Sequence, residues 1–483
     1  MRDRLPEQWV VGAVFVSAMF LNILDTTIVI VALPALGEQF DATTSTIDWV
    51  VVGYLLSLAA FIPASGWIGD RFGTKRTFLF ALAVFVSASA LCGFAQSLEQ
   101  LVAFRMLQGV GGGMLTPVGT AMLFRAFPPA QRAKASRVLI IPTVMAPALG
   151  PILGGYLVDN FSWRWIFFVN LPVGVAAFAF GLVFLNEHRE PRAGRFDLPG
   201  FVLSGGGLAM ILYALGQGPS AGWTSPEVLV TGIVGAVAFA LLVWIELAKA
   251  HPMLDLRLLG NRLFRSANVA ALFGYGSFIG FLFIMPLYLQ EARGLSAFDS
   301  GLTTFPEALG VLVASQIAGR LYLYVGPRRL MAGGLLFVSC LMASLTQVGL
   351  DTDLWLLRAL MFAIGAGMAF VFVPLQAATF ATISPADTGQ ASAIFSTQRQ
   401  VAAALGVAIL ATTLAAQLPE GEPTPGEQVD AFHAVYLVAA ILALIGAAAS
   451  LAIRDRDAAG TMRRVPGDET ELGSVATEAF GAG

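Results

Sequence analysis

Fourteen apolar stretches, each long enough to cross a lipid bilayer as a helix, recur along this chain of 483 residues. A hydrocarbon core about 30 Å thick needs about 20 apolar residues per helix. Charged residues make up only 12% of the chain, about half the share of a soluble domain. We therefore predict an all-α polytopic membrane protein, because helices satisfy their own backbone hydrogen bonds in lipid. The predicted spans are 9–33, 47–66, 77–95, 99–126, 136–158, 165–186, 198–217, 226–248, 265–290, 299–321, 330–349, 354–380, 389–417 and 431–453.

The basic residues alternate between the two sets of loops. One set of loops and both tails hold most of the arginine and lysine, whereas the opposite loops hold only Arg164 and Arg293. Loops rich in arginine and lysine stay in the cytoplasm. The sequence therefore predicts a multi-pass protein of the cytoplasmic membrane, with both termini cytoplasmic and the lipid bilayer as its surroundings.

Several classes of function are excluded by what the sequence lacks. Cys92 and Cys340 fall inside separate spans, and the three histidines are scattered, so neither a metal site nor another cofactor is expected. There is no phosphate-binding G-x-x-x-x-G-K-[ST] loop, and no nucleophile and base stand together, so we do not expect an enzyme. The net charge of −3 favours no nucleic-acid partner. Any transport would have to be driven by an ion gradient or by a partner.

A weak internal repeat divides the chain. Residues 66–105 match residues 319–358 at a shift of 253, and residues 129–150 match residues 385–406 at a shift of 256. Parallel halves with a site at their interface are a transporter architecture. We predict an N-terminal six-helix half over residues 1–190, two inserted helices with cytoplasmic linkers over 191–264, a C-terminal six-helix half over 265–453, and a disordered polar tail over 454–483.

The loop after the second span carries a spaced pattern of glycines and charges. It reads G-W-I-G-D-R-F-G-T-K-R over residues 66–76. Three bases alone would be an ordinary cytoplasmic anchor, but the full spacing resembles motif A of the major facilitator superfamily. The resemblance implies a gate latch between the two halves, with Asp70 as the latch acid; the second copy has Leu323 at that place. The implied latch residues are Gly66, Asp70, Arg71, Gly73, Lys75 and Arg76.

Three further motifs resemble the same superfamily. The G-P-x-x-G-G run of Gly150, Pro151, Gly154 and Gly155 resembles motif C, the antiporter signature of the drug-exporting branches. Residues 24–34 resemble the L-D-x-T-I-V-N-V-A-L-P signature of fourteen-helix drug:proton antiporters, with Ile30 in place of the asparagine, and residues 105–113 resemble motif B. Over nearly its whole length the chain is similar to the DHA2 (EmrB/QacA-like) branch.

Charged side chains inside the membrane are the candidate proton-coupling residues. Asp25 lies about two thirds along the first span, where a carboxylate is costly and marks function, although Asn22 one turn away could be a structural partner. Glu307 lies among apolar neighbours in the tenth span. Arg105 can raise the acidity of a facing carboxylate, and the resemblance assigns it to proton coupling. The candidate coupling set is Asp25, Arg105 and Glu307.

Further polar residues within the spans are candidates for the substrate cavity. They are Asn22, Gln108, Gln316, Gln376 and Arg399. Arg399 in the cavity would favour an anion, whereas Glu307 there would favour a cation.

The combined prediction is a proton-coupled multidrug efflux antiporter. It would export lipophilic, mainly cationic small molecules by alternating access, in exchange for protons. The alternative is a proton-coupled exporter of a physiological metabolite, such as a siderophore, an organic acid or a lipid. The resemblance places the protein in a bacterial cytoplasmic (inner) membrane, with a periplasmic adaptor and an outer-membrane channel as partners if the host has two membranes.

Overall fold

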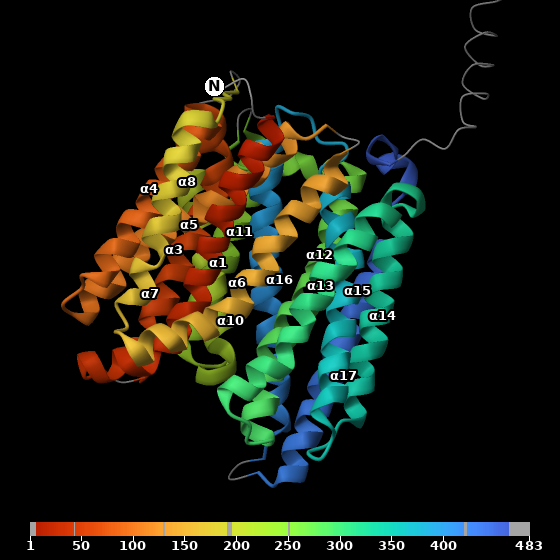
Figure 1. Cartoon of the computed structure of the whole chain (residues 1–483). Coiled ribbons are helices and arrows are strands. Elements are labelled where there is room, and N and C mark those ends of the chain that lie inside the picture. Colours follow the sequence, from red (N-terminus) through yellow and green to blue (C-terminus); the bar gives the residue numbers. More distant parts are fainter. Residues whose placement is uncertain are drawn as a thin grey trace, which may run out of the picture.

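A computed structural model describes residues 6–42, 44–128, 131–190, 196–249, 252–419 and 423–462. Every regular element within these ranges is helical, and the long helices stand side by side in two groups (Figure 1). The all-α prediction is confirmed.

The first group, the N-terminal bundle, contains the helices up to residue 184. Within it α3 packs on α5, α4 on α5 and α1 on α6. Its helices are α1 (Glu7–Phe40), α2 (Thr44–Ile47), α3 (Trp49–Phe72), α4 (Thr74–Gly93), α5 (Leu98–Ala126), α6 (Arg132–Asn160), α7 (Trp165–Phe168) and α8 (Asn170–Phe184).

The second group, the C-terminal bundle, is built in a similar way. Here α13 packs on α15, α12 on α16 and α14 on α17. Its helices are α12 (Arg262–Leu287), continued by a π-helical turn at Tyr288–Ala292, α13 (Ala297–Val325), α14 (Pro327–Ser344), α15 (Leu354–Thr379), α16 (Thr388–Gln417) and α17 (Pro425–Ser450).

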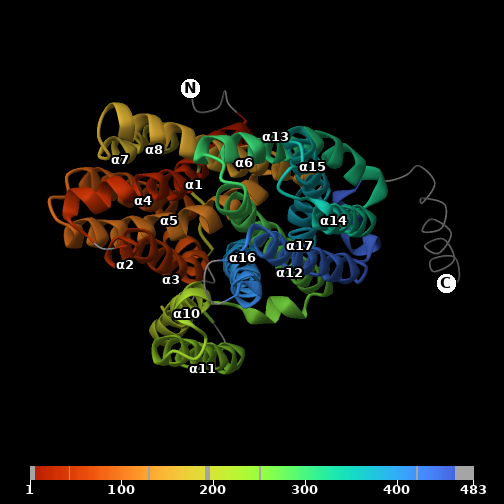
Figure 2. The same cartoon turned by 90° about the horizontal axis from the view of Figure 1, so that it is seen from below.

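A helix pair lies outside the two bundles. It consists of α9 (Leu198–Phe201), a π-helical turn at Val202–Gly206, α10 (Gly207–Ala221) and α11 (Pro226–Ala248). Figure 2 shows the pair beside α3 and α16, and α10 contacts both. The Trp223 indole donates a hydrogen bond to Thr412 of α16 (2.9 Å). The inserted pair therefore touches one helix of each bundle.

Twelve of the fourteen predicted spans coincide with helices long and apolar enough to cross a membrane within the described residues. The other two predicted spans correspond to α5 and α6, each 29 residues long. α5 carries three charged residues and five glycines, and many side chains of α6 lie outside the described residues. The chain is a multi-pass membrane protein, and the count of fourteen crossings stays a prediction.

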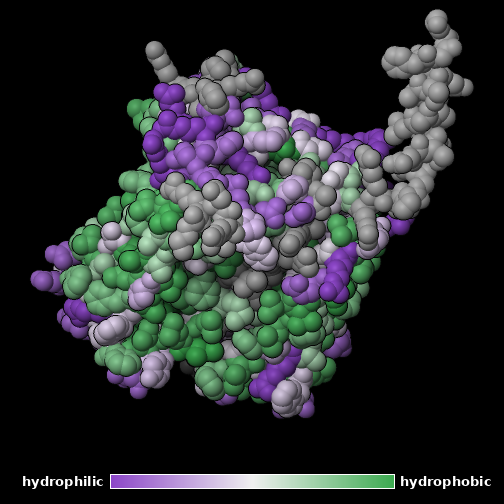
Figure 3. All heavy atoms as spheres, turned by 45° about the horizontal axis from the view of Figure 1, so that its top comes forward, coloured by the Kyte–Doolittle hydropathy of each residue, from purple (hydrophilic) through white to green (hydrophobic). Residues whose placement is uncertain are grey.

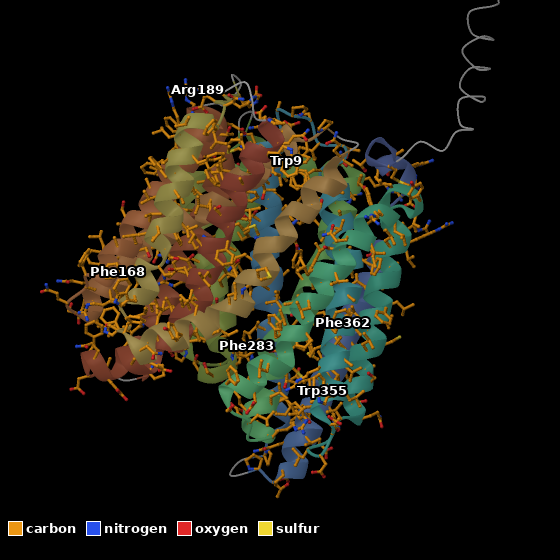
Figure 4. The ribbon with its side chains drawn as sticks, viewed as in Figure 1. Trp9, Phe168, Arg189, Phe283, Trp355 and Phe362 are labelled. Atoms are coloured by element: carbon orange, nitrogen blue, oxygen red, sulfur yellow. The ribbon has the colours of Figure 1, made fainter. Side chains whose placement is uncertain are left out.

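The surface is divided into polar ends and an apolar band. Figure 3 shows hydrophilic residues gathered at the end that carries the N-terminus, and a hydrophobic belt below it. Figure 4 places Arg189 and Trp9 at that end and Trp355 at the opposite one. This is the distribution that a protein spanning a bilayer needs, because lipid cannot solvate charges.

The repeat is visible at two glycine turns. Gly73 joins α3 to α4 with φ 102°, and Gly326 joins α13 to α14 with φ 82°, backbone conformations that favour glycine. An acid from further along the chain caps the helix after each turn: Glu187 accepts from the Lys75 amide (3.0 Å) and Asp455 from the Arg328 amide (2.9 Å).

The tail differs from its prediction at its start. We expect disorder from residue 454, yet Asp455–Thr461 forms a 3₁₀ helix, η7, that contacts α14 and α15. Thr461 is buried and shares a hydrogen bond with the Tyr322 hydroxyl. The polar composition concealed this segment because its side chains are used for capping rather than for solvation. Residues 463–483 of the predicted tail lie outside the described residues.

Candidate functional site

The two charged residues predicted in the N-terminal bundle form a buried ion pair. Asp25 of α1 and Arg105 of α5 are joined through Arg105 Nη1 and Asp25 Oδ2, and both side chains are 0% exposed. Such a pair is stable only when further hydrogen bonds compensate for the lost hydration. Removal of either partner would leave the other as an isolated charge in a dry interior.

Those further hydrogen bonds come from neighbouring helices. Asp25 Oδ1 accepts from Gln108 Nε2 (2.8 Å) and from Asn170 Nδ2 of α8 (2.9 Å). Arg105 donates through Nη1 to Gln108 Oε1 (2.7 Å) and through Nε to the Val50 carbonyl (3.1 Å). Asn170 also donates to Ser89 of α4 (3.1 Å). We call Asp25, Arg105, Gln108, Asn170 and Ser89 the acid–base cluster.

An aromatic ring and an amide border the acid–base cluster. The Arg105 guanidinium lies 4.1 Å from the centroid of the Tyr54 ring, a favourable cation–π geometry. Tyr54 Oη and Asn22 Nδ2 are buried without a hydrogen-bond partner among the described atoms. Both lie beside Gly112, where a Cβ would be 2.6 Å from Asn22 Nδ2 and 3.0 Å from Tyr54 Oη. Polar side-chain atoms therefore continue from the cluster toward Asn22.

Helical periodicity explains how α5 contributes. Arg105, Gln108 and Gly112 share one face at spacings of three and four residues. The first two reach the carboxylate and the glycine leaves room for Tyr54 and Asn22. Of the predicted cavity residues, Gln108 is fully buried inside the cluster, and its place on a cavity wall stays a prediction. Asn22, the alternative structural partner of Asp25, forms no hydrogen bond with it in the described part of the chain.

Asn170, Ser89 and Tyr54 were missed as site residues by reasoning from the sequence. Each looks like an ordinary polar residue in an apolar span, and only helix packing brings them together. The one signal was Asn170 itself, an amide between apolar residues in F-F-V-N-L-P.

A second site lies where the two bundles meet, near the end with the termini. Asp70 of α3 pairs with Arg125 of α5 (2.9 Å), and Arg125 also donates to the Pro385 carbonyl before α16 (3.0 Å). Both acid and base belong to the N-terminal bundle, so Arg125 is the residue that crosses to the other bundle. Sequence reasoning placed Arg125 only among the basic loop residues.

Close backbone approach completes this contact, which we call the gate contact. A Cβ on Gly66 would lie 2.7 Å from the Gly389 carbonyl oxygen, so only glycine fits. The Asp70 carboxylate lies against Gly389, the second residue of α16, where the helix dipole favours an anion. The rings of Phe124 and Phe380 stack across the contact with centroids 4.4 Å apart.

Two bases of the predicted latch, Lys75 and Arg76, bind within their own bundle. Lys75 donates through Nζ to the carbonyls of Leu182 (2.8 Å) and Leu185 (2.7 Å) at the end of α8. Arg76 lies 3.6 Å from Glu187. These contacts hold the loop and α8 together rather than joining the two bundles.

The predicted antiporter motif packs α6 against α1. A Cβ on Gly150 would overlap Thr27, and one on Gly154 would lie 2.9 Å from the Ile28 side chain. Nothing lies within 4 Å of the corresponding position on Gly155. The side chain of Pro151 lies outside the described residues. Gly150 and Gly154 thus set the distance between α6 and the helix that carries Asp25.

Glu307 is not part of the acid–base cluster. It lies in α13 of the C-terminal bundle and is 8% exposed. Its backbone packs against Gly365 of α15, and no described residue forms an ion pair with its carboxylate. Gln316 of the same helix is exposed.

The last two predicted cavity residues lie near each other. The half-buried Arg399 of α16 and Gln376 of α15 both lie near Tyr275 in α12. This group is in the C-terminal bundle and is separate from the acid–base cluster.

A bundle of membrane-spanning helices with a buried acid–base pair and a glycine joint between two halves defines a membrane transport protein. The chain belongs to the Major Facilitator Superfamily, whose sequence profile matches residues 15–407 and again 267–480. The two matches begin 252 residues apart (267 − 15), close to the shifts of the internal repeat. The superfamily is one of transporters rather than enzymes.

Similar proteins include bacterial drug-resistance proteins. The chain is 34% identical over 418 residues to the multidrug resistance protein B homolog of Mycobacterium tuberculosis H37Rv, covering 85% of this chain and 77% of the relative. It is 32% identical over 403 residues to the multidrug export protein EmrB of Escherichia coli K12, covering 82% and 78%.

The fold is similar to a solved structure. The human organic anion transporter MFSD10 matches with a TM-score of 0.67 and 16% identity, over 92% of this chain and 100% of the other. At that identity the likeness concerns the fold alone.

Proposed function

We propose that this protein is a proton-coupled multidrug efflux antiporter of the bacterial inner membrane, with both termini in the cytoplasm. The observation that carries the proposal is the buried pair of Asp25 and Arg105. A carboxylate inside the membrane is costly, and such residues usually mark a functional site. The names of the bacterial relatives support drug export, and the arginine-rich end supports the orientation.

Asp25 would be the group that takes up the proton. As a carboxylate it accepts hydrogen bonds from three side chains: Arg105, Gln108 and Asn170. Protonation removes its charge, and Arg105 then loses its partner and must find another. Because these side chains come from α1, α5 and α8, a proton on Asp25 changes how the three helices pack. Tyr54 and Asn22 would lead toward the space between the bundles.

Glu307 would be the second acid, shared between protons and a cationic substrate. Its carboxylate has no described cationic partner and sits among apolar residues of α13. A lipophilic cation supplies both a positive charge and apolar surface, which suits such a site. Substrate and proton would then compete for Glu307, as exchange requires.

The gate contact would close the cytoplasmic end during part of the cycle. Its residues hold the two bundles together there through Arg125, Gly66 and Gly389. Rocking of one bundle against the other would break it and admit substrate from the cytoplasm. In a host with two membranes, an adaptor and an outer-membrane channel would carry the substrate further.

Proton release from proteoliposomes tests this function. Lipophilic cations, organic anions and metabolites are added in turn to wild type, Asp25→Asn and Glu307→Gln. We expect cations to cause release from wild type and the Asp25→Asn variant to lose it. Normal transport by both variants would contradict the mechanism. Release only with metabolites or anions would replace multidrug export by export of a physiological compound.

A further inference from the structure

Arg399 is a cation deep inside the membrane domain without an acid to neutralise it. It lies eleven residues beyond Thr388, the first residue of α16, which at about 1.5 Å per residue is about 16 Å along the helix and near mid-membrane. Among the described residues no carboxylate forms an ion pair with it. A guanidinium at this depth is costly unless it meets a partner.

Arg399 stands on a helix that contacts both bundles. In Figures 1 and 2 α16 runs through the middle of the molecule, and it contacts α3 and α5 as well as α12. Arg399, Ala402 and Gly406 share one face of α16, and this face packs on Gly276 of α12. Tyr275 is the neighbouring residue of α12, which explains its contact with Arg399.

The surroundings of Arg399 combine polar atoms with aromatic rings. The Tyr275 hydroxyl interacts with Arg399 and with Gln376. The Tyr275 ring stacks on Phe372 with centroids 4.9 Å apart, and Phe278 meets Phe372 edge-on at 5.4 Å. A cluster of largely buried aromatic rings thus lies beside the cation.

One polar atom of the group around Tyr275 has unused hydrogen-bonding capacity. Gln376 Oε1 is buried without a partner among the described atoms. Buried polar atoms are nearly always paired in a finished interior. An unpaired amide oxygen close to a guanidinium that has no ion-pair partner among the described residues favours a binding position over a packed core.

We propose that Arg399, Tyr275 and Gln376 form a subsite for the anionic group of an aromatic substrate. A carboxylate or sulfonate would accept two parallel hydrogen bonds from the planar guanidinium, which suits such groups better than an ammonium does. The substrate's ring would lie against the Tyr275 and Phe372 rings. The inference rests on the proposed export function and extends its cargo from lipophilic cations to aromatic acids and zwitterions.

Binding of a matched pair of probes tests the subsite. 2-Naphthoate and its neutral amide, 2-naphthamide, have the same ring and differ in charge. Each is titrated calorimetrically into the purified full-length chain, as wild type, Arg399→Gln and Arg399→Lys. We expect Arg399→Gln to weaken naphthoate binding at least tenfold, about the worth of one charged hydrogen bond. Naphthamide binding should stay within twofold, and Arg399→Lys should keep part of the preference for the acid.

Arg358→Gln is the matched control. It removes an arginine of α15 in the same bundle. The Arg358 guanidinium lies 4.8 Å from the centroid of the Trp355 ring. This variant should leave the ratio of the two affinities unchanged. Equal loss of both probes in Arg399→Gln, or loss of neither, would overturn the subsite and leave Arg399 as a brace between α12 and α16.

A separate readout distinguishes this inference from the proposed function. Proton release driven by tetraphenylphosphonium, a cation without an acid group, should persist in Arg399→Gln. If wild type fails to respond to this cation, the proposed function fails whatever the naphthoate result. If wild type responds but Arg399→Gln binds naphthoate normally, only the subsite is wrong.

Discussion

At the scale of single residues, the acid–base cluster concentrates most of the chemistry. Asp25 and Arg105 neutralise each other inside a dry interior, and Gln108 and Asn170 complete the hydrogen bonds of the carboxylate. Breaking a buried pair by removing one partner costs about 3–5 kcal/mol, because an uncompensated charge remains. Removing both partners costs less.

The thermal stability of single and double variants checks this coupling. Asp25→Asn and Arg105→Gln should each lower the melting temperature in detergent. The double variant should melt higher than the sum of the two losses predicts, because no isolated charge is left. Strictly additive shifts would mean that the two residues act independently, contrary to the observed contact.

The sequence alone predicts the members of this cluster better than their contacts. A charge within an apolar span is conspicuous, so Asp25 and Arg105 can be found without a structure, as can Glu307 outside the cluster. Which of them meet depends on the rotation and packing of helices, so the partnership of Asn170 with Asp25 could not be predicted. Arg125 was missed for a different reason, since a base at a helix end looks like an ordinary anchor of the loop.

At the scale of elements, glycines fix the distances between helices. Gly150 brings α6 against Thr27 of α1, and Gly406 brings α16 against Gly276 of α12. The two contacts occupy related places in the two bundles. Small residues allow such close packing in membranes, where van der Waals contact is a main source of helix association.

Separate substitution of Gly150 and Gly155, five residues apart, tests the role of Gly150. Gly150→Leu should separate α6 from α1, lower the melting temperature and abolish drug-driven proton release. Gly155→Leu adds the same side chain where nothing lies within 4 Å and should leave both quantities near wild type. Equal effects of the two variants would show that the α1–α6 distance is not critical.

The element η7 gives a second test at this scale. Asp455 caps α14 and Thr461 meets Tyr322, so a chain shortened to residues 1–453 should lose stability. A chain shortened to residues 1–462 keeps both contacts and is the matched control. We expect a lower melting temperature for the shorter chain only, by about the worth of one helix cap and one buried hydrogen bond, roughly 2 kcal/mol. Identical melting of the two chains would contradict an anchoring role.

At the scale of the whole molecule, the two bundles are joined at the end that carries the N-terminus. The Arg125–Pro385 hydrogen bond and the stacked rings of Phe124 and Phe380 are both found there. The inserted pair lies outside this joint and touches α3 and α16. Transport by alternating access requires the joint to open and close.

Cross-linking tests this requirement. In a background with Cys92→Ser and Cys340→Ser, the pair Phe124→Cys and Phe380→Cys should react with a short thiol cross-linker. The linked protein should lose drug-driven proton release, and reduction should restore it. Either single cysteine variant, treated in the same way, controls for modification alone. Full activity of the linked protein would show that this contact never opens during transport.

The meeting of Gly66 with Gly389 has a consequence for energetics. Because one backbone touches another there, opening the joint separates closely packed glycines and leaves the Asp70–Arg125 ion pair intact within the N-terminal bundle. The Arg125–Pro385 hydrogen bond and the Phe124–Phe380 ring stack are among the contacts that part. The two conformations of a molecule built in this way would differ little in free energy. Shifting the population ratio of two conformations from 1:99 to 99:1 takes about 5.5 kcal/mol. At 100 mV this equals the electrical work done on about two to three elementary charges that cross the membrane. A membrane voltage and a few protons are therefore enough to reverse the conformational preference.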